Sequence, residues 1–323
     1  MNKLKKIGLS ALAGSLVAVS ANAGEMAVTG SAWIGFGQTT DTAATFNSMS
    51  DSLNFTGTGE LDNGMTVTLF YEIDGDAGSN ADATDNLDTH YVKLDTDFGS
   101  ITYSGHGVDS NLSANDDKTP NAYEEAWDAG TADADNTLVG TSLNDSFKYD
   151  SPSFNGLQAS FYYAGQDDGT NVVGAYTDIG ITFKPEMVEG LTIGYAEGEK
   201  DESSTLTLDQ DTMYVTYAYG PVTVGYQKSE STTSTSDVTY NKAFESTAYS
   251  ATFAVNENLS IGYGEFEADY ESTSLSDQES SAFTASYTMG SMTIGGLIGS
   301  DDNVKGVDSV DNDKWEASIS FAF

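Results

Sequence analysis

The sequence predicts an all-β protein, a transmembrane antiparallel up-and-down β-barrel of about 16 strands. Apolar and polar residues alternate with period two through most of residues 24–323, which is the spacing of strands with two different faces. A closed barrel leaves no strand edge, and closure is obligatory in lipid because unpaired backbone groups find no water there. A soluble sandwich would alternate too, but so many strands in one unbroken meander fit two packed sheets poorly.

The first 23 residues are expected to be a secretory signal peptide that is removed. Three lysines among the first six residues make a cationic start, residues 7–19 an apolar core, and Ala21-Asn22-Ala23 a small-residue cleavage site. The apolar core is too short to span a bilayer as a helix. We therefore expect the mature chain, residues 24–323, to leave the cytoplasm.

The composition is strongly acidic. The chain has 50 acidic and 12 basic residues, a net charge of −38, and every basic residue is a lysine. Such a surface repels nucleic acid and attracts cations. The same acidity would suit a saline habitat, and the sequence leaves both explanations open. Cysteine is absent, which excludes disulfides and thiolate chemistry.

The first three strands are expected at residues 26–38, 51–60 and 65–73. The third alternates most clearly, and a strong hairpin turn, Asp62-Asn63-Gly64, precedes it. One of its faces carries Met65, Val67, Leu69, Tyr71 and Ile73. Residues 75–86 are polar and acidic, so we expect a loop there.

A six-residue phrase recurs along the chain. Gly190-Leu-Thr-Ile-Gly-Tyr195 returns in varied form at residues 221–226, 258–263 and 291–296, with a looser copy at 99–103. Each copy follows a tight turn, opens a strand, and leads into a longer acidic stretch. Those stretches, expected to be loops, span residues 199–208, 229–242, 267–279 and 300–312. The pattern predicts a meander of hairpins with short turns at one end and long loops at the other.

Residues 107–144 break the alternation. This insert holds a single cation, Lys118, and eight carboxylates: Asp109, Asp116, Asp117, Glu124, Glu125, Asp128, Asp133 and Asp135. A structureless insert of this length in a compact chain is usually functional. We expect it to fold inside the barrel and narrow the pore, with Tyr123 and Trp127 packing it against the wall on one short helical turn. The alternative is an acidic loop in solvent outside the barrel.

The candidates for the pore constriction within the insert are Glu124, Glu125, Asp128, Asp133 and Asp135. On the wall, Lys148 lies between Phe147 and Tyr149, so it faces the lumen if those aromatic residues face lipid. A lysine facing lipid near the midplane would cost about 2–4 kcal/mol, which favours the lumen. The orientation of Lys93 stays open.

Three motifs resemble a known family. They are Tyr91-Val-Lys-Leu-Asp-Thr-Asp-Phe-Gly-Ser-Ile-Thr-Tyr103, Phe147-Lys-Tyr-Asp-Ser-Pro-Ser-Phe-Asn-Gly-Leu157 and the terminal Ser320-Phe-Ala-Phe323. Together they resemble the general porins of Gram-negative outer membranes, especially the sixteen-stranded, alphaproteobacterial-type branch. The resemblance covers essentially the whole mature chain. The second motif is its most specific part.

The resemblance implies an outer-membrane barrel that sits in lipid, a homotrimer in the family's pattern, and a passive pore for small hydrophilic solutes and ions. The terminal motif, ending in Phe323, resembles the aromatic signal that the outer-membrane assembly machinery reads. In that family the third external loop folds into the barrel, and its acidic residues face basic residues on the wall. The insert lies where that loop should be, between the fifth and sixth strands.

Carried over residue by residue, the family's wall cations are mostly missing. Lys148 stands where a wall arginine is common, Asp88 replaces a second arginine, and Gly105 or His106 takes the place of a third basic residue. We therefore expect a mostly acidic constriction that prefers cations.

Neither a cofactor nor catalysis is expected. His90 and His106 are the only histidines and cysteine is absent, so a transition-metal site is not expected. Calcium prefers clustered oxygen ligands, for which the candidates are Asp116, Asp117, Asp301 and Asp302. A surface barrel whose acidic loops bind calcium or a partner is the alternative function. Nucleophile-elbow, phosphate-loop and metalloprotease motifs are absent.

Overall fold

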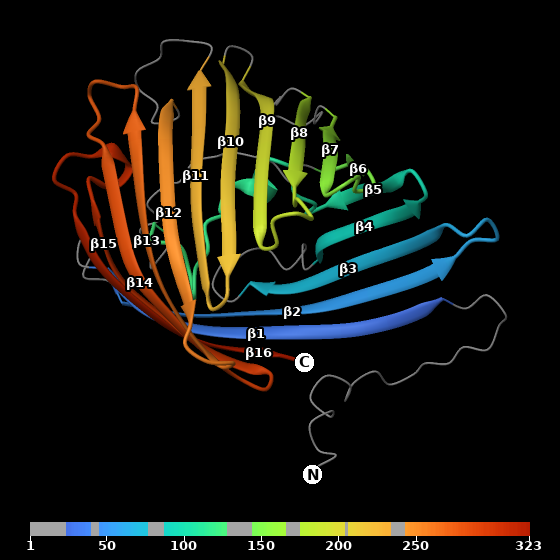
Figure 1. Ribbon diagram of the computed structural model, residues 1–323, viewed down its shortest axis with the longest axis horizontal. Helices are drawn as coiled ribbons and strands as arrows, with labels where there is room; N and C mark the ends of the chain where they lie inside the picture. The colour runs from blue at the N-terminus through green and yellow to red at the C-terminus, as the bar shows by residue number, and fades with distance from the viewer. Residues whose placement is uncertain are drawn as a thin grey trace.

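Sixteen antiparallel strands close into one barrel. The computed structural model describes residues 24–39, 45–76, 87–127, 144–165, 175–203, 206–233 and 243–323. The strands follow one another round the wall in chain order, and β1 pairs with β16 to close it (Figure 1). The predicted fold class and strand number are confirmed.

The strands are β1 (Glu25–Thr39), β2 (Thr45–Glu60), β3 (Thr66–Asp76), β4 (Leu87–Thr96), β5 (Gly99–His106), β6 (Ser146–Asp150), β7 (Leu157–Ala164), β8 (Tyr176–Phe183), β9 (Leu191–Ser203), β10 (Leu206–Tyr219), β11 (Val222–Thr233), β12 (Phe244–Ala254), β13 (Leu259–Tyr270), β14 (Gln278–Met289), β15 (Met292–Asp302) and β16 (Asn312–Ala322). Two short 3₁₀ helices complete the described elements, η1 (Ser113–Asn115) and η2 (Val304–Gly306). Neither helix in this part of the chain is long and apolar enough to cross a membrane.

Each strand presents one apolar and one polar face. On β13, Ile261 and Tyr263 point outward, while Ser260 and Gly262 point toward the barrel axis. The same alternation leaves a row of large apolar side chains exposed on the outside of the wall. The inward side chains of β10 to β14 are mostly serine, threonine and glutamine. An apolar exterior and a polar interior are what a barrel in lipid around water requires.

The end of the chain takes part in closing the wall. The backbone N–H of Gly30 donates to the carbonyl of Phe323 (2.7 Å), and the N–H of Phe323 donates to the carbonyl of Gly30 (2.9 Å). A Cβ on Gly30 would lie 2.6 Å from the ring of Phe323, so glycine leaves room for that ring. The last residue therefore continues the ladder between β1 and β16.

The strands extend beyond the boundaries expected at their long-loop ends. Residues 199–208 were predicted to form an acidic loop, and that prediction is wrong: β9 runs to Ser203 and β10 starts at Leu206. The loops predicted at 267–279 and 300–312 are similarly shortened, to 271–277 and 303–311. Of the stretch 75–86, residues 77–86 lie outside the described residues. Charged residues near these ends are therefore part of the wall.

Carboxylates on the outward face line up across five neighbouring strands. This outer acidic row consists of Glu197, Asp211, Glu230, Glu245 and Asp269, each directly opposite the next in the strand register. Glu245 also pairs with Lys228 at 2.7 Å. The row lies on the long-loop side of the outward tyrosines and belongs to the outer surface of the wall.

Candidate functional site

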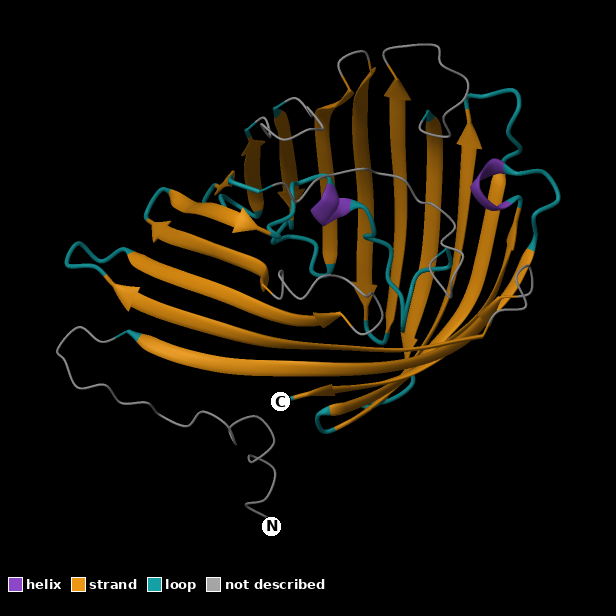
Figure 2. Ribbon diagram, turned by 180° about the vertical axis from the view of Figure 1, so that it is seen from behind, coloured by secondary structure: helices purple, strands orange, loops and turns teal. Residues whose placement is uncertain are grey.

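The insert between β5 and β6 folds inside the barrel over its described part, residues 107–127, as the sequence predicts. Helix η1 belongs to this part and lies within the ring of strands (Figure 2). The segment hydrogen-bonds to inward side chains of β7, β8, β11, β12, β14 and β16 in turn. It thus follows the inner wall from β7 to β16, more than half of the barrel. Residues 128–143 lie outside the described residues.

Asp178, on the inward face of β8, anchors the start of the loop. Its carboxylate accepts hydrogen bonds from the backbone N–H of Leu112 (2.8 Å), the side-chain amide of Asn111 (2.9 Å) and the hydroxyl of Tyr176 (3.0 Å). The side chain of Asp178 is only 2% exposed. A carboxylate tolerates this burial because three donors satisfy it. The hydroxyl of Ser160 on β7 also donates to Asn111.

Gln227, on the inward face of β11, holds the middle of the loop. Its amide nitrogen donates to the carbonyls of Asn115 (2.7 Å) and Asp116 (3.1 Å). Its amide oxygen accepts from the backbone N–H of Lys118 (2.6 Å). One side chain therefore serves three backbone groups of a segment that would otherwise leave them unpaired away from bulk water.

The next residues of the loop reach the last strands. Ser250 on β12 donates its hydroxyl proton to the carbonyl of Pro120 (2.5 Å), and the N–H of Ala122 donates to the hydroxyl of Thr284 on β14 (3.3 Å). The hydroxyl of Tyr123 donates to the carboxylate of Glu316 on β16. Burial and the bond to Glu316 raise the pKa of Tyr123. It remains a protonated donor at neutral pH.

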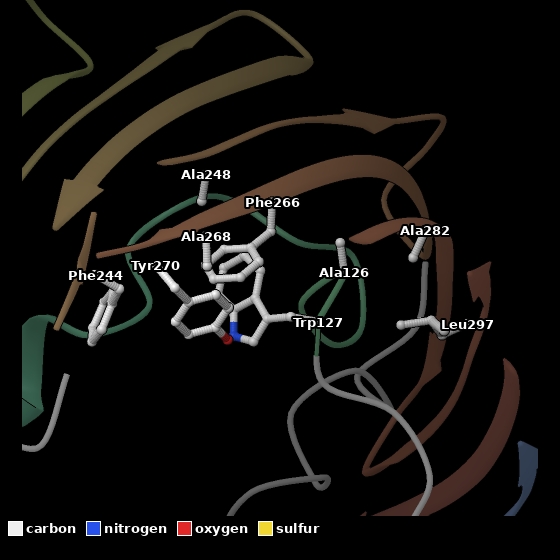
Figure 3. Close-up of a cluster of buried hydrophobic side chains, with 9 residues drawn as sticks. All are labelled: Ala126, Trp127, Phe244, Ala248, Phe266, Ala268, Tyr270, Ala282 and Leu297. Atoms are coloured by element: carbon white, nitrogen blue, oxygen red, sulfur yellow. The ribbon is translucent and has the colours of Figure 1, made fainter. Parts of the chain in front are cut away.

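An apolar cluster inside the barrel receives Trp127. The Trp127 and Phe266 rings are 4.7 Å apart and tilted. The cluster comprises Ala126, Trp127, Phe244, Ala248, Phe266, Ala268, Tyr270, Ala282 and Leu297, and Trp127 points into it (Figure 3). Tyr123 and Trp127 thus both pack the loop against the wall. The predicted helical turn around them is wrong, since residues 122–127 form bends and turns and the helical turn lies at Ser113–Asn115.

The acidic candidates of the insert are only partly described. Glu124 and Glu125 are half-buried inside the barrel, and the side-chain amide of Asn121 donates to Glu125 (3.1 Å). Asp128, Asp133 and Asp135 lie outside the described residues. The structure therefore places two of the five predicted carboxylates beside the loop's wall contacts.

The basic side chains of the wall are engaged by neighbouring groups. Lys148 points inward between Phe147 and Tyr149 and donates to the carbonyl of Asp109 (3.0 Å). Lys93 also points inward, with its ammonium 2.9 Å from Asp95, which settles its orientation.

Asp88 and His106 lie next to each other at the long-loop ends of β4 and β5. Nδ1 of His106 contacts the backbone carbonyl of Asp88, and the side chain of Asp88 is exposed. The structure brings this pair together at the rim of the wall. Lys148 and the loop carboxylates lie along the loop instead.

The calcium candidates are not brought together. Asp301 points inward and pairs with Lys314 at 2.7 Å, both side chains being fully buried, whereas Asp302 points outward and is exposed. Asp116 and Asp117 are neighbours in the loop. Within the described ranges, no three acidic or histidine residues are grouped so as to hold a metal ion.

One carboxylate of the loop, Asp116, titrates in an unusual range. Burial, followed by the negative charge of Asp117, raises the pKa of Asp116 to about 7. The neighbouring Lys118 opposes this shift only weakly. The negative charge inside the barrel therefore changes around neutral pH.

Sequence reasoning missed the anchors on the wall. Asp178 and Gln227 are ordinary polar residues in the inward phase of their strands, and nothing local marks them as loop contacts. The apolar cluster, in contrast, is visible in the sequence pattern of β13. Phe266 stands between Glu265 and Glu267, so an aromatic residue occupies the phase that elsewhere is polar.

Comparison with known proteins agrees with this architecture. The family model described as Gram-negative porin matches residues 8–323. The anion-selective porin from Comamonas acidovorans matches with a TM-score of 0.70 at 16% identity, covering 93% of this chain and 100% of its own. A substituted Rh. blastica porin matches with a TM-score of 0.65 at 13% identity, covering 92% and 100%.

A third similar structure is OmpT of Vibrio cholerae with loop L8 deleted, an outer membrane protein. Its TM-score is 0.70 at 12% identity, with 93% of this chain and 100% of that one covered. No curated protein sequence matches the chain. At these identities the structural likeness shows the fold.

Proposed function

Because the chain belongs to the Gram-negative porin family, an outer-membrane barrel that lets small solutes and ions pass, we propose that its pore prefers cations. The observation that carries the proposal is the charge of the loop inside the barrel. Its described part brings Asp116, Asp117, Glu124 and Glu125 into the lumen.

The inward lysines offset this charge only in part. Lys93 and Lys314 are paired with carboxylates of their own strand or its neighbour, and Lys148 contacts the loop backbone. Fixed negative charge in a narrow passage with walls of low dielectric constant concentrates cations and excludes anions. One structural relative is described as anion-selective. The same fold thus serves either preference, and the local charges decide.

The test is the reversal potential of purified protein across a KCl gradient in a planar bilayer. We expect a potential of the cation-selective sign at 0.1 M salt. It should fade toward 1 M as the Debye length falls from about 10 Å to about 3 Å. Replacing Glu124 and Glu125 by glutamine should weaken the preference, and Lys148→Glu should strengthen it. A potential of zero, or of the anion-selective sign, at 0.1 M salt would reject the proposal.

The proposal extends to assembly. We propose that the outer-membrane assembly machinery reads the terminal Phe323 and that the mature barrel, residues 24–323, forms homotrimers. The position of Phe323 supports the first part, since its backbone completes the closing ladder with Gly30. Cross-linking of the purified barrel, read as a band at three times the monomer mass, tests the second part.

A further inference from the structure

The recurring phrase places a glycine on the inward face of four strands. The glycine is the fifth residue of each copy: Gly194 on β9, Gly225 on β11, Gly262 on β13 and Gly295 on β15. Glycine inside a strand weakens it and often marks a place where another backbone approaches closely. None of the four has a positive φ, so the backbone conformation does not demand glycine. Their role must lie in what faces them.

Three of these glycines face the loop. A Cβ built on Gly225 would lie 2.3 Å from Cδ of Pro120 and 3.2 Å from Cα of Thr119. A Cβ on Gly295 would lie 2.2 Å from Cδ2 of Tyr123. The distances to Pro120 and Tyr123 are far below the ordinary carbon–carbon contact of about 3.5 Å. The loop therefore rests directly on the wall at these points.

Two more contacts continue the same line. A Cβ on Gly262 would lie 2.7 Å from Oγ1 of Thr284, the wall hydroxyl that accepts from the loop, and 3.2 Å from the backbone nitrogen of Ala122. A Cβ on Gly180 of β8 would lie 3.0 Å from Cβ of Asn111. The loop meets Gly180, Gly225, Gly262 and Gly295 in chain order, through Asn111, Thr119 with Pro120, Ala122 and Tyr123. Gly194 differs, because its Cβ would meet Tyr214 of the neighbouring strand at 2.1 Å.

We propose that Gly180, Gly225, Gly262 and Gly295 are positioning residues that form a groove in the inner wall. The loop sinks into this glycine groove, and its depth sets the open cross-section of the pore. The hydrogen-bond anchors fix where the loop lies along the wall, and the glycine groove fixes how far it protrudes into the lumen. The inference rests on the channel function and not on the preference for cations.

Gly225→Ala is the sharpest test. The ring of Pro120 is rigid, and the strand is held by β10 and β12 on both sides, so relief must come from the loop. Restoring ordinary contact requires the loop to move by roughly 1 Å toward the barrel axis. We expect a lower single-channel conductance at 1 M KCl. Influx of uncharged sugars into liposomes should slow more steeply with sugar size than in the wild type.

Two matched controls add the same methyl group elsewhere. Gly59→Ala on β2 meets no atom within 4 Å, and the nearest atoms to the methyl of Gly194→Ala belong to Tyr214 on the neighbouring strand of the wall. Both should conduct like the wild type. Pro120→Ala removes Cδ, so the double variant with Gly225→Ala should regain the conductance that the single variant loses. Folding of each variant is checked by its heat-modifiable migration in detergent gels.

The outcomes separate clearly. Unchanged conductance in folded Gly225→Ala, an equal loss in Gly194→Ala, or no recovery in the double variant would overturn the glycine groove. If Gly225→Ala does not fold, Gly180→Ala replaces it, since the shift that it demands is only about half an ångström. A zero reversal potential together with the expected conductance loss would reject the cation preference and leave the groove standing.

Discussion

Asp178→Ala should release the start of the loop from the wall. Two of the three hydrogen bonds that the carboxylate accepts, from Leu112 and Asn111, join the loop to β8, and the third stays within the wall. A hydrogen bond to a charged group contributes roughly 1.5–3 kcal/mol net, so the two bonds contribute about 3 kcal/mol even at the lower end of that range. This free energy corresponds to roughly a hundredfold change in the equilibrium between the seated and the released loop.

Amide hydrogen exchange measures this equilibrium at the bond itself. The backbone N–H of Leu112 donates to Asp178 and the residue is fully buried, so its exchange follows the opening of the loop start. We expect exchange of the Leu112 amide to accelerate roughly a hundredfold in Asp178→Ala. Amides in the ladder between β12 and β13, far from the anchor, serve as an internal reference and should not change.

Asp178→Asn separates the charge from the hydrogen bonds. The variant removes the same negative charge, but its amide oxygen can still accept from Leu112. Asn111 can turn its own amide so that its oxygen faces the new NH₂ group. We therefore expect a much smaller acceleration than in Asp178→Ala. A change below threefold in Asp178→Ala, or an equal change in both variants, would refute this account of the anchor.

Other contacts lead to four further predictions, of which the first, on Asp116, has two readouts. Since the pKa of Asp116 is raised to about 7, the cation preference should grow from pH 6 to pH 8, and Asp116→Asn should abolish that growth in the reversal potential. The folded-state pKa lies above the ordinary 3.8, so the seated loop should gain stability as the pH falls from 7 toward 4, which loop amide exchange reports. Deleting Phe323 should leave the protein in the periplasm, and normal heat-modifiable outer-membrane barrels would contradict this. Lys314→Met strands the fully buried Asp301 and should lower stability by about 3–5 kcal/mol, with recovery in Lys314→Met/Asp301→Leu, measured by thermal unfolding in detergent. Because like charges stand opposite each other in the outer acidic row, raising the salt from 0.1 M to 1 M should raise the unfolding temperature, and a fall would refute that reading.

The fold could be predicted from the sequence because each strand faces lipid on one side and water on the other. Apolar and polar residues therefore alternate with period two along the strands. The prediction failed at the long-loop ends, where charge was taken as a sign of loop. Within residues 199–208 the outward Glu199 lies opposite Asp209 in the paired strands β9 and β10. A strand that continues beyond the apolar band of the membrane meets water on its outer face, so it can carry charge there without breaking its pairing.

The site could be predicted only in part, because the sequence pattern indicates the loop but not the wall residues that anchor it. The loop is recognisable in the sequence because the alternation stops there, and Trp127 indicates that the loop packs against an apolar partner. Its anchors, Asp178 and Gln227, are separated from their loop partners by 66 or more residues in the chain. Which inward residues they meet depends on the strand register and on the path of the loop, neither of which a local pattern records. The glycines of the repeated phrase can be seen in the sequence, but their positions in the strands do not show that the loop packs on them.

The net charge of the chain is a poor guide to what a permeating ion experiences. The outer acidic row, from Glu197 to Asp269, faces away from the lumen, and the wall separates it from the pore. Inside the barrel, several carboxylates are engaged in structural contacts. Asp178 and Glu316 hold the loop, and Asp301 pairs with Lys314. The carboxylates that the loop itself carries therefore contribute a large part of the field in the pore. The loop's depth in the glycine groove sets the distance from those carboxylates to a passing ion, so the groove acts on both the width and the field of the pore.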